Sequence, residues 1–69
     1  MKNRYDFTAL RDRIRNIYGT EKAFANAIHW KLQRLESRLT NETEFNRAEI
    51  LQILPLVGLG WQDVRAYFF

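Results

Sequence analysis

Apolar residues recur every three or four positions along most of this chain, a spacing typical of helices with one buried face. The first apolar stripe lies between Asp6, which can cap a helix start, and Gly19, which favours a helix end. Its members are Phe7, Leu10, Ile14, Ile17 and Tyr18. A first helix is therefore predicted between these two signals, and we expect residues 1–5 to form a short, poorly ordered arm.

Two shorter stripes follow at once and predict a pair of helices joined by a tight corner. The first of the pair is expected to run over residues 21–28 after a cap by Thr20, and the second over about residues 31–39. The residues expected to face inward are Phe24, Ala25, Ile28, Leu32, Leu35 and Leu39. Two short helices with a corner of this length predict a helix-turn-helix motif over about residues 20–39.

The last third of the chain predicts two further helices. Asn46 and Glu49 have the spacing of a capping box, so a fourth helix should begin near Asn46. Pro55 removes a backbone donor and crowds the preceding turn, so we expect this helix to stop or kink at Leu54. A short helix from Trp61 to about Tyr67 should end the chain. Together the stripes predict an all-α fold, a compact single domain of five helices over residues 1–69.

The composition excludes several classes of site. The chain has no cysteine and one histidine, His29, so neither a disulfide nor a metal site is expected. No glycine-rich phosphate loop or nucleophile with a nearby base is evident, so we expect no enzyme, no cofactor and no small-molecule substrate. No apolar run approaches the roughly 20 residues that cross a bilayer. A protein of the cytoplasm without a membrane partner is the expectation.

The charge distribution favours a polyanionic partner. The net charge is +3, and basic residues exceed acidic ones before residue 42 but not after it. Such an asymmetry is typical of a protein with one face toward nucleic acid. Three arginines of the first helix, Arg11, Arg13 and Arg15, fit either phosphate contacts or an ordinary solvated face.

Residues 19–28, GTEKAFANAI, resemble the first helix of the motif in phage Cro-type and repressor-type helix-turn-helix regulators. Leu35 and Leu39 match the inward positions of the recognition helix in that family. Asn46-x-x-Glu49-Ile50 and Val64-x-x-Tyr67-Phe68 resemble the fourth helix and the ending of small Cro-like proteins from phages of Gram-positive bacteria. The resemblance implies a transcriptional regulator that binds double-stranded operator DNA in the cytoplasm of a bacterial host.

The resemblance also implies which side chains touch DNA. A third helix in the major groove, within a homodimer that reaches half-sites about 34 Å apart, would use its polar side chains. In this scheme Gln33 pairs with adenine and Arg34 with guanine. The candidate DNA-binding residues are Thr20, Lys31, Gln33, Arg34, Ser37 and Arg38.

The corner departs from the family pattern and supports a second hypothesis. His29-Trp30-Lys31 stands where the family usually has glycine, a hydrophobic residue and serine, and Glu21 stands where it often has a phosphate-contacting glutamine. These changes suit an antirepressor or modulator that binds the DNA-binding face of a partner phage repressor and blocks its DNA binding. Its candidate contact residues are Glu21, His29, Trp30, Leu32 and Glu36. Glu36 could also read cytosine or form an ion pair within the chain, and we favour the ion pair. A diverged domain without a strong ligand is a third possibility.

Overall fold

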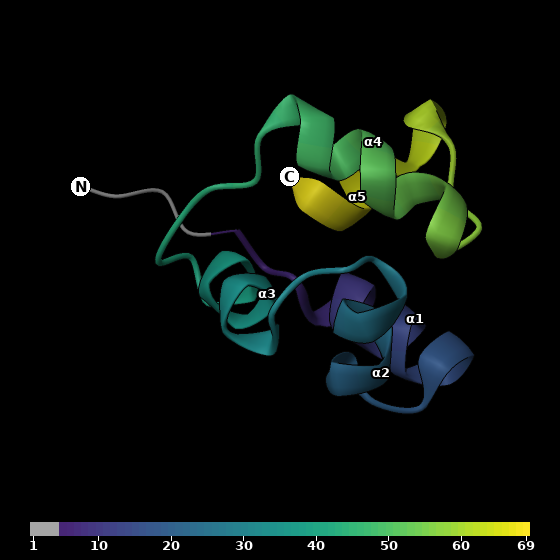
Figure 1. Cartoon of the computed structure of the whole chain (residues 1–69). Coiled ribbons are helices and arrows are strands. Elements are labelled where there is room, and N and C mark those ends of the chain that lie inside the picture. Colours follow the sequence, from purple (N-terminus) through teal and green to yellow (C-terminus); the bar gives the residue numbers. More distant parts are fainter. Residues whose placement is uncertain (1–4) are drawn as a thin grey trace.

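In the computed structural model, which describes residues 5–69, the chain folds into five α-helices and one short 3₁₀ helix (Figure 1). The elements are α1 (Thr8–Tyr18), α2 (Glu21–Ala27), α3 (Leu32–Leu39), α4 (Arg47–Leu56), η1 (Trp61–Asp63) and α5 (Val64–Phe68). Residues 5–69 contain no strand, so the prediction of an all-α fold with five helices is confirmed. The predicted arm lies outside the described residues except for Tyr5.

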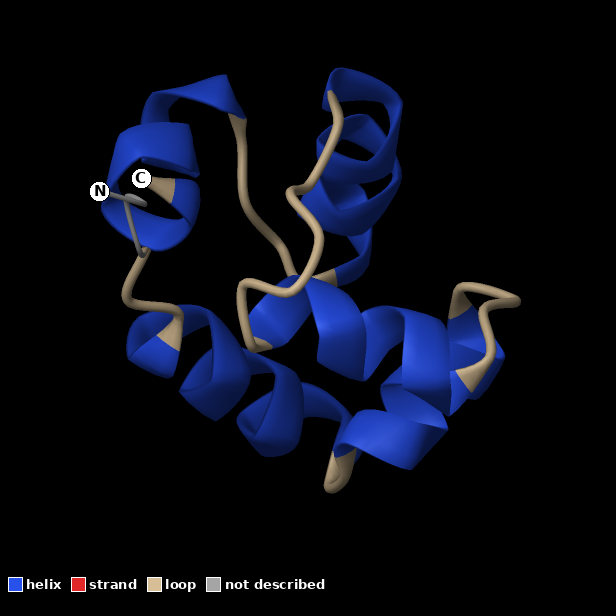
Figure 2. Cartoon of the chain, turned by 90° about the vertical axis from the view of Figure 1, so that its left-hand side faces the viewer, coloured by secondary structure: helices blue, strands red, loops and turns tan. Residues whose placement is uncertain are grey.

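The helices form two layers around one core. Helices α1, α2 and α3 make one layer, and α4, η1 and α5 cover it from above (Figures 1 and 2). The buried apolar residues are Phe7, Leu10, Ile14, Phe24, Ala25, Ile28, Trp30, Leu35, Leu39, Ile50, Ile53, Leu54, Val57, Val64 and Phe68. The inward residues predicted for the first stripe include one error, because Ile17 is 50% exposed. The core therefore draws on every α-helix, which is how so short a chain stays compact.

The start of α1 differs slightly from the prediction. The N-cap position is Phe7, whose side chain cannot cap, whereas the Asp6 carboxylate accepts a hydrogen bond of 2.9 Å from the Thr8 amide. Asp6 thus satisfies a free first-turn amide from one residue further out. At the other end Gly19 adopts a φ of 86°, as expected for a glycine that ends a helix.

Helix α4 passes through Pro55, so the predicted stop at Leu54 is wrong. The helix continues to Leu56 and closes with two bonds, from the Gly58 amide to the Pro55 carbonyl and from the Leu59 amide to the Leu54 carbonyl. Gly58 has a φ of 69°, which such a closure requires. Proline has a helical φ, although it removes the bond to the carbonyl four residues back and crowds that carbonyl. Because Pro55 is the next-to-last residue of α4, the missing bond affects only the final turn of the helix.

Helix α1 holds the end of α4 with two polar side chains. The Arg13 Nε donates to the Val57 carbonyl at 2.6 Å, and the Tyr18 hydroxyl donates to the Leu56 carbonyl at 2.7 Å. These carbonyls form the negative end of the α4 dipole, where a cation is favourable. Arg13 is therefore a structural residue, and the expectation of an ordinary solvated face is wrong for it.

The two ends of the described chain are tied down differently. The Tyr5 amide and carbonyl both bond to the Asn41 side chain at 3.0 Å, so Tyr5 does not belong to a loose arm. At the other end Phe68 is 2% exposed and completes the core, whereas Phe69 is 67% exposed. Of the last two apolar residues, Phe68 therefore belongs to the core and Phe69 to the surface.

Candidate nucleic-acid interface

The corner between α2 and α3 is a glycine-type helix end built without glycine. His29 has a φ of 63°, its amide donates to the Asn26 carbonyl, and the Trp30 amide donates to the Ala25 carbonyl at 2.9 Å. This pair of bonds is the Schellman closure, which needs one residue in the left-handed region. Histidine enters that region more readily than most residues other than glycine and Asn or Asp. His29 thus takes the left-handed conformation expected of the corner glycine in Cro-type regulators.

Trp30 turns inward from this corner and is only 6% exposed. The hypothesis that Trp30 is an accessible apolar anchor for a partner protein is therefore wrong. A large indole beside the corner is sheltered by the core, where its apolar area is removed from water. Leu32, the second proposed anchor, is half-buried and packs against the same core.

Lys31 follows at the N-cap of α3 and makes no capping bond through its side chain. An ammonium group has no acceptor for an amide hydrogen, so lysine cannot cap a helix through its side chain. The Lys31 side chain is exposed at the start of α3, the end of the helix that enters the major groove in motifs of this type.

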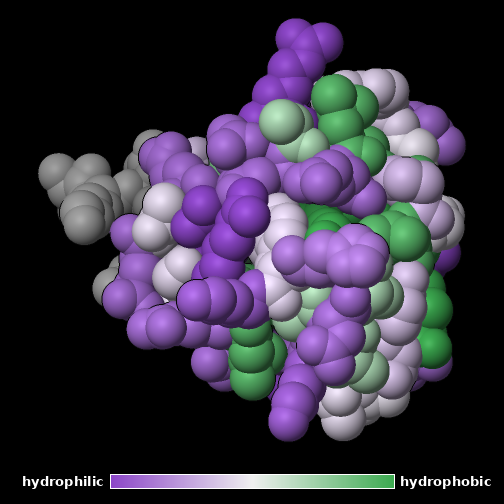
Figure 3. Space-filling model, in the orientation of Figure 1, coloured by the Kyte–Doolittle hydropathy of each residue, from purple (hydrophilic) through white to green (hydrophobic). Residues whose placement is uncertain are grey.

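Helix α3 presents a polar outer surface. Lys31, Gln33 and Glu36 are exposed, and Ser37 is half-buried. Figure 3 shows mostly hydrophilic residues over this region of the molecule, with hydrophobic residues reaching the surface nearer α4. Glu36 makes no ion pair within residues 5–69, so the expected pairing is not found in the described structure.

Two arginines of α3 share one buried carboxylate from α4. Glu49 is 2% exposed and accepts from Arg34 Nη2 at 2.8 Å, Arg38 Nε at 3.0 Å and Arg38 Nη2 at 2.9 Å. It also accepts from the Asn46 amide at 3.0 Å, while its own amide donates to the Asn46 side chain. The predicted capping box is confirmed, and Glu49 also links α4 to α3.

The surroundings of Glu49 keep it ionised. Burial by itself would raise the pKa of the carboxyl, but hydrogen bonds from Arg38, Arg34 and the Asn46 amide lower that pKa to about 2. The hydrogen bond to Glu49 in turn raises the pKa of Arg38. A buried charge of this kind is stable only while its partners remain in place.

Arg34 and Arg38 are left in very different states by this shared contact. The Arg38 side chain is 16% exposed and uses Nε and Nη2 on Glu49 and Nη1 on the Ser37 hydroxyl. The Arg34 side chain is 45% exposed and uses only Nη2. Its guanidinium lies 4.1 Å from the Trp30 ring centroid, a stacking distance. Arg34 is therefore fixed in place with Nε and Nη1 free of partners among residues 5–69, whereas all three nitrogens of Arg38 have partners.

Glu21 is occupied within its own chain. Its carboxylate pairs with Arg11 at 3.4 Å and Arg15 at 3.5 Å, both from α1. Of the three α1 arginines, these two therefore lie beside an acid and do not form an isolated basic patch. The charge of Glu21 is therefore balanced by neighbours in its own chain.

The remaining predicted residues fall into clear groups. The Thr20 hydroxyl accepts from the Ala23 amide at 3.0 Å, so its cap is confirmed. The Ser37 hydroxyl donates to the Arg34 carbonyl at 2.9 Å. The structure brings Lys31, Gln33 and Arg34 together on an accessible part of α3, whereas Arg38 faces α4. Glu49 was missed as a partner of α3, since the capping-box spacing reveals only its contact with its own helix.

Two broader features follow from the described residues. No group of three or more His, Cys, Asp or Glu side chains among residues 5–69 is arranged to hold a metal ion. Within the same residues, no helix has the length and apolar character needed for a membrane crossing.

Comparison with known proteins places the chain in a family. No curated protein matches the sequence. A family model does match over residues 3–69, nearly the whole chain. The chain belongs to that family, which is described as "Protein of unknown function (DUF739)".

Proposed function

We propose that this protein is a phage-type transcriptional regulator that binds operator DNA through α3. The observation that carries the proposal is the state of Arg34, a half-exposed guanidinium fixed by Trp30 and Glu49 beside exposed Gln33 and Lys31. Side-chain ordering on binding costs roughly 0.5–1.5 kcal/mol for a long side chain. A guanidinium that is already held avoids part of this cost.

The chemistry of these three side chains suits a major groove. The groove is about 12 Å wide and admits one α-helix. Arginine donates in pairs to the guanine O6 and N7 atoms, and Glu49 occupies only one of the five N–H groups that an arginine side chain carries. Gln33 matches the donor and acceptor of adenine, and Lys31 supplies a cation for a backbone phosphate. We therefore assign Arg34 and Gln33 to base reading and Lys31 to phosphate binding.

Three other candidates receive different roles. Each of the three Arg38 nitrogens already contacts Glu49 or Ser37, so we assign Arg38 to holding α3 against α4. Ser37 accepts from Arg38 and donates to Arg34, so its hydroxyl supports these two arginines. Thr20 lies exposed at the start of α2, where free amides favour an anion, and remains a phosphate-contact candidate.

The modulator hypothesis loses support from the same geometry. Its aromatic anchor, Trp30, is buried, and its acid, Glu21, is paired inside the chain. Binding energy at protein interfaces is concentrated in accessible aromatic and arginine anchors. The residues left to that hypothesis, His29 and Glu36, are exposed but supply no apolar anchor.

A DNA titration with matched arginine variants tests the proposal. Duplexes from the region flanking the coding sequence are titrated by fluorescence anisotropy at several salt concentrations. Arg34→Ala should weaken binding by about 1–3 kcal/mol and relax the sequence preference at one position. Arg65→Ala, which removes an exposed cation from α5, serves as the control and should change affinity far less. Affinity should also fall steeply with salt, because phosphate contacts release counterions.

Two results would overturn the proposal. Equal losses in Arg34→Ala and Arg65→Ala would indicate general charge attraction without a reading helix. The second result is a protein that shifts no duplex but releases a partner phage repressor from its operator, which would establish the modulator instead.

A further inference from the structure

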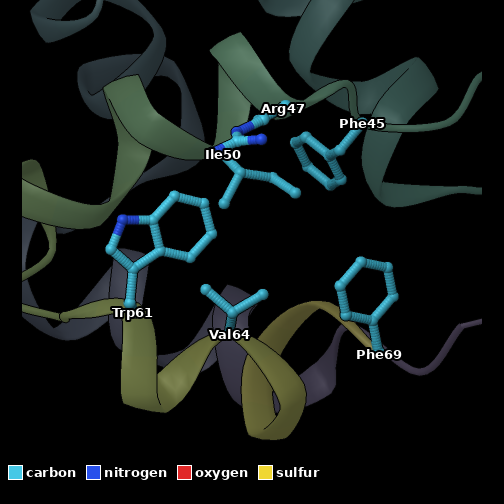
Figure 4. Close-up of a pocket in the computed structure, with 6 residues that line it drawn as sticks. All are labelled: Phe45, Arg47, Ile50, Trp61, Val64 and Phe69. Atoms are coloured by element: carbon cyan, nitrogen blue, oxygen red, sulfur yellow. The ribbon is translucent and has the colours of Figure 1, made fainter.

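A hollow lined by aromatic and aliphatic side chains opens between the start of α4 and the final segment η1–α5. Its volume is about 520 Å³, and its lining consists of Phe45, Arg47, Ile50, Trp61, Val64 and Phe69. Figure 4 shows these side chains around one opening, which α4 and the loop before it face from one side and η1 and α5 from the other. Pockets that hold small molecules have volumes of about 300–1,000 Å³, so the hollow has the size of such a pocket.

The aromatic walls of the hollow are held by contacts outside it. The Phe45 ring packs edge-on against Phe7 and Phe68, with ring centroids 5.3 and 5.2 Å apart. The Phe69 ring is 67% exposed, yet it packs edge-on against Tyr5 with a centroid distance of 5.6 Å. A ligand therefore meets walls that are already in place, which lowers the conformational cost of binding.

Arg47 places one positive charge at the edge of an apolar interior. Ile50 and Val64 are 5% and 7% exposed and form the floor of the hollow. Arg47 is the charged residue of the lining, and its guanidinium lies 5.7 Å from the Trp61 ring centroid. The Arg47 side chain is exposed and forms no ion pair within residues 5–69. The hollow therefore joins an apolar interior to a cation that lacks an acidic partner among these residues.

The acids near the hollow do not neutralise this cation. Glu44 lines a separate, adjoining cavity of about 30 Å³ and makes no ion pair with Arg47. The Asp63 carboxylate accepts a hydrogen bond of 3.0 Å from the Gly60 amide and so serves the start of η1. Glu49, from the same helix as Arg47, is buried and paired with the two arginines of α3.

We propose that the hollow binds a small organic anion with one carboxylate and an aromatic or branched apolar body. A planar guanidinium matches a carboxylate through two parallel hydrogen bonds, so Arg47 holds the charged end of the ligand. The apolar body lies between the Trp61 and Phe69 rings over the floor, where its surface is removed from water. The inference does not depend on DNA binding by α3.

The size of the hollow favours a small molecule over a protein partner. A stable protein interface buries at least about 1,000 Å² and involves roughly 20–30 residues on each side. The lining of the hollow consists of six residues. A protein partner would need extensive contacts beyond the hollow, whereas a small ligand finds its apolar contacts and its counter-charge within the lining itself.

An NMR titration of the full chain with two matched compounds tests the site. The probes are 4-phenylbutyrate and its neutral amide, 4-phenylbutyramide, which have the same apolar body and differ in charge. We expect 4-phenylbutyrate to bind with a dissociation constant of about 2 mM or tighter, from the binding energy usual for each ligand atom. Its binding should shift the amide signals of residues 45–50 and 61–69. The neutral amide should bind at least about fivefold more weakly, because it cannot form charge-assisted hydrogen bonds with Arg47.

Two matched arginine variants give a specific readout. Arg47→Gln should remove the preference for the carboxylate, so that both compounds bind with similar affinity. The control is Arg65→Gln, because Arg65 is also an exposed cation of this layer but does not line the hollow. Arg65→Gln should keep the wild-type preference within about twofold. Far-UV circular dichroism confirms that each variant is folded.

A wall variant separates the apolar contact from the charge. Trp61 is 53% exposed, so Trp61→Ala removes the ring without opening the core. This variant should weaken both compounds by at least about fivefold, as expected for an aromatic contact that dominates binding.

Several results would overturn the inference. These are no binding of 4-phenylbutyrate by wild type up to about 10 mM, several times the expected dissociation constant, equal affinities for the carboxylate and the amide, and a preference that persists in Arg47→Gln. Signal shifts confined to α3 would also overturn it. The comparison of the two compounds on wild type decides the matter even if a variant does not fold. Arg34 does not line the hollow, so the DNA titration of Arg34→Ala and this ligand titration fail separately.

Discussion

The starts of α3 and α4 show how differently two neighbouring helices of this molecule are secured. Each begins after one extended residue, Lys31 for α3 and Asn46 for α4. The start of α4 has a complete capping box, and its Glu49 also holds two arginines of α3. The start of α3 has no capping bond from the Lys31 side chain and no acidic residue in its first turn.

The start of α4 is arranged for stability, whereas the start of α3 suits the contact with DNA that we propose. An acid near a helix start is favourable because of the helix dipole, so Glu49 stabilises α4 in addition to accepting its ion pairs. A lysine at the same place stabilises nothing locally, but it leaves a cation where a recognition helix meets phosphate. Local rules of stability are commonly broken at functional sites and compensated elsewhere. Here the compensation for α3 comes from α4, through Glu49.

The largest effect is expected from removing the Glu49 carboxylate, which links α4 to α3. Glu49→Ala should lower the free energy of unfolding by about 3–5 kcal/mol, because it leaves two arginines and a capped amide without their acceptor. Since a domain of this size has only a few kcal/mol of stability, Glu49→Gln provides a milder variant that keeps the side-chain shape. Urea denaturation followed by circular dichroism measures both. Glu36→Ala, an exposed acid of α3, should change the value by less than about 0.5 kcal/mol. Similar losses in Glu36→Ala and Glu49→Ala would contradict a special role for Glu49.

Acid should produce an effect of nearly the same size. The pKa of Glu49 is about 2 in the folded protein and 4.5 ordinarily, so its stabilisation is complete above about pH 4.5 and is lost as the pH falls toward 2. The difference in pKa corresponds to about 3 kcal/mol of stability. Thermal unfolding from pH 6 to pH 2.5, in wild type and Glu49→Gln, measures it. The variant should show a clearly flatter profile, and parallel profiles would assign the acid sensitivity to other groups.

The smallest effect is a gain at the start of α3. Lys31→Ser supplies the missing cap and should raise the free energy of unfolding by about 1 kcal/mol, whereas Asn46→Ala should lower it by a similar amount. For a domain of this length, 1 kcal/mol corresponds to roughly 4–8 °C in Tm, so calorimetry resolves both changes. The same Lys31→Ser variant should bind DNA more weakly. A variant that is neither more stable nor weaker in binding would remove the contrast between the two helix starts.

Much of the fold was predictable because its signals are local. Helix faces follow from the spacing of apolar residues, and the capping box from the spacing of Asn46 and Glu49. The two local errors have local causes. Pro55 lies so near a helix end that its missing donor does not end α4 early, and Ile17 lies at the edge of its stripe, where no second helix covers it.

The candidate site was predictable only in part. The polar side chains of α3 were identified from sequence, but their order of importance was not. Trp30 was considered as an accessible partner anchor and is buried, and Arg38 was grouped with Arg34 but is held against α4 by Glu49. Both errors arise because a helical pattern shows which side chains share a face and does not show what another helix brings against that face.

The sequence alone determined the helices, their caps, the inward stripe of each and the location of the corner. These depend on residues within a few positions of one another, whose spacing is fixed by the geometry of the helix. Only the tertiary structure decided that Glu49 holds one arginine of α3 half-exposed and the other largely buried, and that Phe69 stands beside an open hollow. These features depend on residues brought together by packing across the chain, and packing is set by the whole core at once.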